Sequence, residues 1–474
     1  MKAISLTEVI NNIPIKGSHI INQDTTFNNV EFDSRKVGPG SLFVPLTGGA
    51  TDGHQYIDQA IKQGAVATLW SSSDQSAPED KVSVIYVEDT LKAMQALAQY
   101  YRRLINPTVI GITGSNGKTT TKDMTAQVLI VKYHVHKTQG NYNNEIGVPY
   151  TLLKMPEDTE VAVIEMGMSG FGEIELLSKI AQPDIAAITL IGESHLEYLG
   201  TRAGIAKAKL EILYGLKDGG SFFYPGEEVL IEQEMPALNK TVNTIRFGLS
   251  KENDVYAYDL IEEQDKTYFK TNLDENVLCM IPIIGSYNVS NALIALSIAR
   301  SLNVPIEQAI FQLAQFELTE HRLEWLPSHK GAQILNDAYN ASPTSMSAIL
   351  QTLSQANIQH TGRKIAVLGD IRELGDQSAA YHEKLADNIS PKHIDKVYLF
   401  GSEMRHLYHV LQDTYSPENL YYEEASHENL IQVLEQDIQE DDIVLVKSSL
   451  GVDLLKVVTA LTGHPTHNFL RQED

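Results

Sequence analysis

The chain has 474 residues, of which 43% are hydrophobic and 21% charged, and its formal net charge is −24. This length exceeds a single hydrophobic core, so we expect about two to four domains of ordinary globular composition. The acidic excess disfavours nonspecific nucleic-acid binding, which requires a positive surface. No apolar run reaches the length of a membrane span and the N-terminus lacks a long apolar segment, so we expect a cytoplasmic protein without membrane insertion.

The cysteine content agrees with a reducing compartment. Cys279 is the only cysteine, so an intrachain disulfide is impossible. It lies within an apolar run at 277–281, and we interpret it as a core residue.

The first predicted domain covers residues 1–104 and is of the α/β type. Short apolar runs alternate there with segments of helical spacing. We expect strands at 41–46, 65–70 and 82–87, and helices at 56–63 and 90–104. Pro107 marks a linker before the next strand.

The second predicted domain covers residues 105–318 and carries a parallel sheet. Its largely apolar runs suit strands that helices cover on both faces. We expect strands at 109–112, 161–166 and 184–189, helices at 120–133 and 288–302, and antiparallel structure at 244–284.

The third predicted domain covers residues 319–474 and alternates again between strands and helices. We expect strands at 364–369, 396–401 and 443–447. The pattern is Rossmann-like, but it contains no phosphate-binding loop of its own. The predicted fold class is therefore α/β, with three domains.

Residues 113–119 read TGSNGKT and form the most informative motif. A buried strand, a glycine turn, a Lys-Thr pair and a helix follow one another, an arrangement that points backbone N–H groups at phosphates. We expect Lys118 to reach the β- and γ-phosphates of ATP, and Thr119 to bind Mg²⁺. Ile112 stands where the common pattern has a glycine, so this is a shorter form of the loop. The alternative is a glycine-rich turn without a ligand.

Two polar residues follow later strands of the same domain. Glu165 ends one predicted strand, and His195 follows the next. Ligands of parallel sheets bind at the carboxyl ends of strands, so both residues are candidates for binding Mg²⁺. Each of them, taken alone, is also compatible with an ordinary structural residue.

Other polar residues carry a weaker signal. Lys207 and Lys209 lie in a helical stretch, where composition alone predicts an exposed face. The segment 140–149 is dense in asparagine, which suits binding of an amide or a sugar but also fits an ordinary turn. A similar cluster recurs at 336–343.

Seven motifs occur in a fixed order: TGSNGKTT, GNYNNEIGVP, EMGMSG, SHLEYLGTRAGIAKAKLEI, GSYNVSNALIAL, EHRLEW and DAYNASPTSM. Together they resemble the Mur ligases, which build the peptide stem of bacterial peptidoglycan. The resemblance spans almost the whole chain and is strongest to the branch that adds a D-alanyl-D-alanine dipeptide. Segments 32–40 and 52–54 resemble a UDP-binding domain. The resemblance thus implies an N-terminal UDP-sugar domain, a central P-loop ATPase domain and a C-terminal ligase domain.

The resemblance also implies roles for residues at matching positions. The implied ATP site comprises Thr113, Gly114, Ser115, Asn116, Gly117, Lys118, Thr119, Thr120, Asn291 and Arg322. The implied UDP-substrate site comprises Ser34, Arg35, Asp52, Gly53, His54 and Asn144. The implied metal site holds two Mg²⁺ ions and comprises Thr119, Glu165, His195 and Lys209, the last as a carbamate. The implied catalytic residues are Lys118, Lys209, Arg322 and Asp337.

Three positions depart from the family pattern. Tyr287 stands where many relatives have histidine, near the expected adenine site. The segment 447–450 reads KSSL in place of the usual KGSR, so the contact of that arginine is missing. Arg372 stands where an apolar residue is common.

The activity implied by the resemblance is ATP-dependent amide formation. A UDP-N-acetylmuramoyl-tripeptide would be activated as an acyl phosphate and joined to D-alanyl-D-alanine by a monomeric enzyme. One alternative is the related ligase that adds the third stem residue, although no D-N-P-R segment of that branch is found. A second alternative is a P-loop ATPase that acts as a switch. The residues leave open whether the third stem residue is lysine or diaminopimelate, and whether the acceptor ends in D-alanine or D-lactate.

Overall fold

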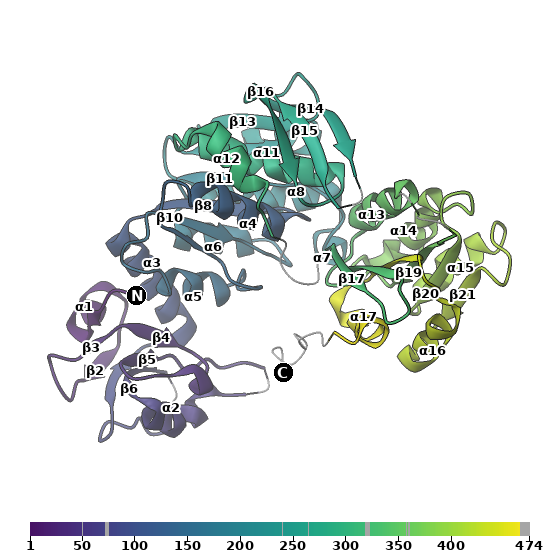
Figure 1. Ribbon diagram of the computed structural model, residues 1–474. Coiled ribbons are helices and arrows are strands. Elements are labelled where there is room, and N and C mark those ends of the chain that lie inside the picture. The colour runs from purple at the N-terminus through teal and green to yellow at the C-terminus, as the bar shows by residue number, and fades with distance from the viewer. Residues whose placement is uncertain are drawn as a thin grey trace.

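The computed structural model describes residues 1–49, 51–71, 75–238, 240–263, 265–317, 323–356, 358 and 361–464. Three α/β units follow one another along the chain (Figure 1), which confirms the predicted fold class. The N-terminal unit is purple, the central unit runs from blue to green, and the C-terminal unit runs from green to yellow.

The N-terminal unit is built on a five-stranded sheet whose strands are parallel except for β2 at one edge. In pairing order the strands are β2 (Gly17–His19), β7 (Ser83–Tyr86), β6 (Ala65–Trp70), β5 (Ser41–Phe43) and β4 (Asn29–Glu31). A separate antiparallel pair is formed by β1 (Ile4–Ser5) and β3 (Thr26–Phe27). The helices are α1 (Leu6–Asn12), α2 (Ile57–Gln63) and α3 (Thr90–Ile105).

Helix α3 fastens the N-terminal unit to the central one. Asp89 caps its first turn by accepting from Lys92 N, and the helix ends where Asn106 adopts a left-handed conformation. The buried Arg102 side chain donates through Nε to Ala181 O at 2.9 Å and through Nη2 to Gln182 O at 3.0 Å. These bonds fix the end of one unit against a loop of the next, because buried carbonyl groups need donors.

The central unit contains a nine-stranded sheet. In pairing order the strands are β16 (Asp274–Ile281), β15 (Thr267–Thr271), β14 (Val255–Glu262), β13 (Asn243–Gly248), β12 (Ser221–Pro225), β11 (Ile185–Ile188), β8 (Thr108–Thr113), β10 (Val161–Glu165) and β9 (Val135–Lys137). The expectation of antiparallel structure across 244–284 is wrong at its start, because β13 pairs in parallel with both neighbours. Among the described residues of this sheet, antiparallel pairing is confined to β14, β15 and β16, which follow one another closely in sequence.

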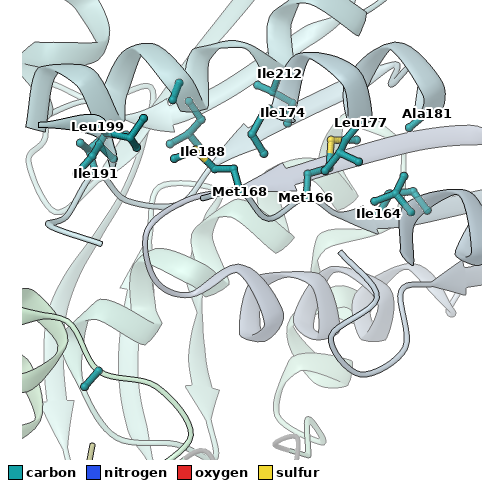
Figure 2. Packing of buried hydrophobic residues seen from close by; sticks show 14 of the residues in the cluster. Ile164, Met166, Met168, Ile174, Leu177, Ala181, Ile188, Ile191, Leu199 and Ile212 are labelled. Atoms are coloured by element: carbon teal, nitrogen blue, oxygen red, sulfur yellow. The ribbon is translucent and has the colours of Figure 1, made fainter. Parts of the chain in front are cut away.

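Helices cover both faces of this sheet. On one face α4 (Lys118–Leu129), α11 (Ser286–Ser301) and α12 (Ile306–Leu313) pack against one another. The unit also contains the helices α5 (Gly147–Leu153), α6 (Glu173–Ala181), α7 (Leu196–Leu199), α8 (Arg202–Leu210), α9 (Ile212–Gly215) and α10 (Val229–Glu234). Figure 2 shows the apolar layer beside α6, in which Ile174 and Leu177 lie close to Met166 and Met168. This layer supports the carboxyl end of β10, where Glu165 lies.

The C-terminal unit has a six-stranded sheet in which the edge strand β17 alone is antiparallel to its neighbour. The strands are β17 (Glu324–Pro327), β18 (Gln333–Asp337), β22 (Ile443–Lys447), β19 (Lys364–Gly369), β20 (Lys396–Phe400) and β21 (Leu420–Glu423). The helices are α13 (Pro343–Gln355), α14 (Ser378–Lys384), α15 (Met404–Leu411), α16 (His427–Asp437) and α17 (Leu455–Thr462). The carboxyl ends of its parallel strands carry the loops that contact the central unit.

Two further observations concern the whole described chain. Cys279 is buried and free, as predicted for a core residue. Within the described ranges, none of the helices combines the length and apolar character needed to cross a bilayer. For the domain bounds we propose to keep 1–104, 105–318 and 319–474, on the support of the five-, nine- and six-stranded sheets, one in each unit.

Candidate active site

The TGSNGKT segment forms a loop between β8 and α4, at the carboxyl end of the central parallel strands. Gly117 precedes the helix with φ 80°, and Lys118 is its first residue. The Lys118 ammonium turns back over the loop and donates to Gly114 O at 2.8 Å. A loop of this shape directs N–H groups and a cation into one concave space, which is a site for phosphates.

Glycine is required at two positions of this loop. A Cβ on Gly114 would lie 1.8 Å from Thr189 Oγ1, and the backbone there has φ 151°. A Cβ on Gly117 would lie 2.6 Å from Asn291 Oδ1. Thr189 also donates to Asn116 O at 2.5 Å, so the end of β11 braces the loop from the side. Sequence reasoning missed Thr189, although its place at a strand end was a usable signal.

Asn291 lies on α11 next to the loop. Its amide oxygen accepts from Thr121 Oγ1 at 3.1 Å, and its Nδ2 donates to Asn288 Oδ1 at 3.0 Å. One hollow beyond it is lined by Asn116, Gly117, Thr189, Leu190, Pro225, Glu227, Glu228, Phe247, Gly248, Leu249, Tyr287, Ser290 and Asn291. The hollow combines an apolar wall with fixed amides, so it can take a flat ring such as a nucleobase.

A second hollow lies between the phosphate loop and the C-terminal unit. Its lining includes Lys118, Thr119 and Thr120 from the loop and helix, and Asp337 and Lys447 from the facing strand ends. Across its rim, Asn116 Nδ2 donates to Ser342 Oγ at 2.8 Å, and the Thr344 hydroxyl donates to the Glu193 carboxylate. The phosphate loop is therefore closed from above by residues that lie far away in sequence.

A third hollow, of 620 Å³, opens on the other side of Lys118. It is lined by Lys118, Asn143, Asn144, Glu145, Gly167, Met168, Ser169, Glu173, Leu176, Leu177 and His195. Asn144 Oδ1 accepts from Gly147 N at 2.8 Å and so shapes the start of α5. The lining combines Lys118 and His195 with Glu145 and Glu173, and the Lys118 ammonium is the group that can receive a carboxylate.

Glu165 ends β10 beside this hollow. Its Oε1 accepts from Asn143 Nδ2 at 2.8 Å, while its Oε2 is buried and has no hydrogen-bond partner among the described residues. A buried carboxylate oxygen without a donor is costly unless a cation or water meets it. This orphan oxygen fits a divalent cation, since hard cations take oxygen ligands.

Lys209 is buried, in contradiction to the exposed helix face that its composition predicted. Of the two lysines that the sequence placed on this face, Lys207 is the exposed one. Burial, together with the positive charge of Lys118, lowers the pKa of Lys209 well below its ordinary value. The structure thus favours the unprotonated form of this amine, which lies near the Lys118 charge of the phosphate loop.

His195 meets the C-terminal unit directly. Its Nδ1 forms an ion pair with the carboxylate of Glu373, and Glu197 N donates to Glu373 O at 3.1 Å. Across the described ranges, no cluster of three or more histidine, cysteine or acidic side chains has the geometry of a metal site. Glu165 and His195 would therefore need other oxygen donors to complete a coordination shell.

Asp337 and Lys447 end neighbouring parallel strands and form a largely buried ion pair. Lys447 Nζ also donates to Asn340 O at 2.9 Å. Sequence reasoning placed Asp337 in the site and noted Lys447 only within the segment that departs from the family pattern, so it did not foresee that the two pair. Arg322, expected in the ATP site, lies outside the described residues.

The predicted UDP-substrate residues other than Asn144 lie in the N-terminal unit and are mostly engaged there. Ser34 Oγ donates to Gln59 Oε1 at 3.0 Å, and Arg35 is 81% exposed beside Asp33. His54 is buried, with Nδ1 at 2.5 Å from Asp52 Oδ1 and Nε2 accepting from Ser71 N at 3.3 Å. A Cβ on Gly53 would lie 2.7 Å from the Leu46 backbone. Arg35 is thus exposed to solvent while it donates to Asp33, whereas Gly53 and His54 shape a separate loop that packs on Leu46.

Fold and site together define a three-domain P-loop protein whose nucleotide loop is covered by a Rossmann-like unit. The chain belongs to the Mur ligase family. Residues 26–102 match the model of the Mur ligase family, catalytic domain; residues 112–299 match the Mur ligase middle domain; and residues 321–450 match the Mur ligase, glutamate ligase domain. These matches cover all three units.

Curated relatives and solved structures agree with this assignment. The chain is 42% identical to the UDP-N-acetylmuramoyl-tripeptide–D-alanyl-D-alanine ligase of Bacillus subtilis (strain 168), over 94% of this chain and 95% of that protein. A crystal structure of MurF from Acinetobacter baumannii superposes with a TM-score of 0.86 at 27% identity, over 98% of this chain and 100% of that one. The MurF ligase of Thermotoga maritima, solved in complex with ADP, gives a TM-score of 0.79 at 28% identity, over 92% and 97%.

Proposed function

We propose that this chain is the ATP-dependent ligase that joins D-alanyl-D-alanine to UDP-N-acetylmuramoyl-tripeptide and so forms the UDP-muramoyl-pentapeptide of peptidoglycan synthesis. The observation that carries the proposal is the position of Lys118, which lines two hollows at once. One hollow faces the C-terminal unit, and the other runs past Asn144 and His195. A γ-phosphate in the first and a peptide carboxylate in the second would meet at this lysine.

The names of the relatives support the choice of substrates. The Bacillus subtilis protein is named for the tripeptide and for D-alanyl-D-alanine, and so is a relative from Escherichia coli (strain K12), which is 31% identical over 97% of this chain. A solved ligase structure named for diaminopimelate is only 18% identical to this chain, so this match supports the fold and not the substrate.

The reaction has two covalent steps. A carboxylate oxygen of the tripeptide attacks the γ-phosphorus of ATP, and the bond to the β-phosphate oxygen breaks, which releases ADP. The amine of the dipeptide then attacks the acyl carbon, loses a proton and displaces phosphate. Lys118 and Arg322 offset the negative charge of the phosphoryl group in transfer, and exclusion of water by the third domain protects the acyl phosphate.

Mg²⁺, as two ions, accompanies ATP in this proposal and supplies charge neutralisation to the phosphates when bound. Thr119, Glu165 and His195 would hold it, and the orphan Oε2 of Glu165 supports this. Lys209 would take part as a carbamate. Its uncharged amine can attack the carbon of CO₂, form an N–C bond and release a proton, which turns a buried cation into an anionic oxygen donor.

The remaining site residues divide between two substrates. For ATP we propose the loop and the residues next to it: Thr113, Gly114, Ser115, Asn116, Gly117, Lys118, Thr119, Thr120, Asn291, Arg322 and Asp337. For the UDP substrate we propose Ser34, Arg35, Asp52, Gly53, His54 and Asn144. Of these, Ser34, Asp52, Gly53 and His54 would contribute by fixing the conformation of the loops around the substrate. The same proposal includes a monomeric enzyme in the cytoplasm, where ATP and UDP-linked precursors are available.

The test is phosphate release from ATP with the tripeptide precursor and D-alanyl-D-alanine, omitting each component in turn. The proposal expects release only when all are present, together with a pentapeptide product by mass. Release with the dipeptide-stage precursor and a free amino acid would assign the chain to the ligase for the third residue. ATP hydrolysis that is indifferent to both co-substrates would reject a ligase altogether.

A further inference from the structure

Arg372 lies at the carboxyl edge of the C-terminal sheet, in the loop that follows β19. Its side chain reaches across to the loop after β22, where Nη2 donates to Gly451 O at 2.6 Å. Its backbone N donates to Ser449 Oγ at 3.0 Å. Two loops that lie far apart in sequence are thus joined around one exposed guanidinium.

The neighbours of Arg372 in sequence and in space lead towards the reaction centre. The following residue, Glu373, contacts His195, which lines the hollow of Lys118. On the other side, Ser448 and Ser449 follow Lys447, which lines the hollow above the phosphate loop. The loop that carries Arg372 and the loop that it contacts thus each continue into a residue that lines a hollow of Lys118 or contacts one.

Arg372 is a single basic residue among acidic ones in the loops at this edge of the sheet. The loops that follow the five parallel strands of this sheet are 338–342, 370–377, 401–403, 424–426 and 448–454. Arg372 is the one lysine or arginine in them, whereas their acidic residues are Asp370, Glu373, Asp376, Glu403, Glu424 and Asp453. Lys447 cannot substitute for it, because Lys447 is buried and paired with Asp337.

The acceptor of the proposed reaction is a zwitterion with one free carboxylate. Its amine must reach the acyl carbon near Lys118, and its carboxylate must enter an edge that is otherwise acidic. An uncompensated anion there would be repelled, whereas a guanidinium offers two parallel N–H donors to a carboxylate. Ser448 Oγ adds a polar group that is buried without a partner in the described chain. Ligands of parallel sheets bind at this edge.

We propose that Arg372 binds the free carboxylate of the incoming dipeptide, with the loop 448–451 as the floor of this subsite. The inference rests on the proposed ligase function and adds a specificity residue to it. The guanidinium in this way supplies from the β19 loop an exposed cation, whereas the one lysine of segment 447–450 is buried and paired with Asp337. Any acceptor that keeps its terminal carboxylate fits, and an amidated acceptor does not.

The test compares D-alanyl-D-alanine with D-alanyl-D-alaninamide in Arg372→Ala and in the unaltered enzyme. We expect the KM for the free dipeptide to rise by about 10- to 100-fold in Arg372→Ala, since charge-assisted contacts carry that much affinity. The KM values for ATP and for the UDP-tripeptide should stay within about twofold, a change of a few tenths of a kcal/mol. The variant should also lose the preference of the enzyme for the free acid over the amide.

Control variants separate binding from loop structure. Lys392→Ala removes an exposed charge from the opposite end of the same sheet and should change neither KM nor selectivity. Gly451→Ala keeps the charge but places a Cβ at 2.6 Å from Arg372 Nη1, so it should raise the dipeptide KM while the protein still folds. An unchanged acid-to-amide preference in Arg372→Ala would overturn the inference. Absence of any ligation by the unaltered enzyme would instead reject the proposed function.

Discussion

His195 and Glu373 meet across the boundary between the central and C-terminal units, and both adopt left-handed backbone conformations, with φ 64° and 63°. Such conformations are uncommon for residues other than glycine and are retained where the surroundings impose them. The hydrogen bond to His195 holds the pKa of Glu373 below its ordinary value. The stabilisation that the Glu373 carboxylate contributes is therefore fully present above the ordinary pKa of glutamate and is lost as the pH falls through the lowered value.

Removal of this contact should loosen the arrangement of the two units. In Glu373→Ala we expect a larger radius of gyration by small-angle scattering in the absence of substrates, because one interdomain ion pair is lost. Asp376→Ala, an exposed carboxylate in the same loop, is the matched control and should leave the radius unchanged. Identical scattering from all three proteins would show that the contact does not hold the units together.

Lys118→Ala should abolish turnover and leave binding of the UDP substrate largely intact. The lysine neutralises charge on the phosphoryl group, so its loss should lower kcat by at least about 100-fold. Calorimetric titration with the UDP-tripeptide measures binding separately from turnover. Near-normal turnover in this variant would disprove the assignment of the phosphate loop.

Lys209→Arg should inactivate the enzyme, because arginine stays charged and cannot form a carbamate. We expect a loss of kcat of about 100-fold or more. Incubation of the native protein with ¹³C-bicarbonate should give a carbamate signal by NMR that is absent from the variant. The lowered pKa of Lys209 favours formation of the carbamate, because it increases the fraction of unprotonated amine that can react with CO₂. A fully active Lys209→Arg enzyme would contradict the carbamate.

Arg102→Met should destabilise the junction of the first two units. Methionine keeps the apolar stem but leaves the carbonyls of Ala181 and Gln182 without their donors. We expect a loss of about 2–4 kcal/mol in the free energy of unfolding. Arg103→Met, at an exposed neighbouring position, should change stability little. Equal denaturation midpoints of the two variants would show that these hydrogen bonds do not stabilise the junction.

The Cys279 thiol should resist alkylation in the native protein. Burial raises its pKa to about 12, from an ordinary value of 9.0. The unfolded thiol ionises first as the pH rises, so this group lowers the free energy of unfolding between those two values. Labelling with iodoacetamide at neutral pH, followed by mass spectrometry, should show modification only after denaturation. Rapid labelling of the folded protein would mean that this strand opens readily.

Local chemistry made much of the fold predictable. The strand at 65–70 and the strands β19 and β22 lie where apolar runs predicted them, since buried parallel strands are apolar throughout. The helix expected to reach residue 133 ends instead at Leu129, because the last residues form a turn before β9. Strand β13 was assigned to the wrong kind of pairing, since alternation does not reveal the direction of a neighbouring strand.

The site was predictable where a motif occupies a short segment, and not where distant segments meet. The phosphate loop was readable because its glycines, lysine and threonine are consecutive. The burial of Lys209 was not predictable, because the residues that bury it come from the tertiary structure and not from its own helix. The contacts of Glu373 with His195 and of Arg372 with Gly451 join loops of different strands, and no local pattern encodes them.

The most direct test of the ligase mechanism measures the transfer of a labelled oxygen atom from the peptide carboxylate to the released phosphate. The tripeptide precursor is labelled with ¹⁸O in its terminal carboxylate and is incubated with the enzyme, ATP and D-alanyl-D-alanine. Attack of that carboxylate on the γ-phosphorus predicts one ¹⁸O atom in each released phosphate, in equal amount to the pentapeptide formed. Unlabelled phosphate would mean that water, and not the peptide carboxylate, receives the phosphoryl group, and would contradict the acyl-phosphate ligase proposed for this chain.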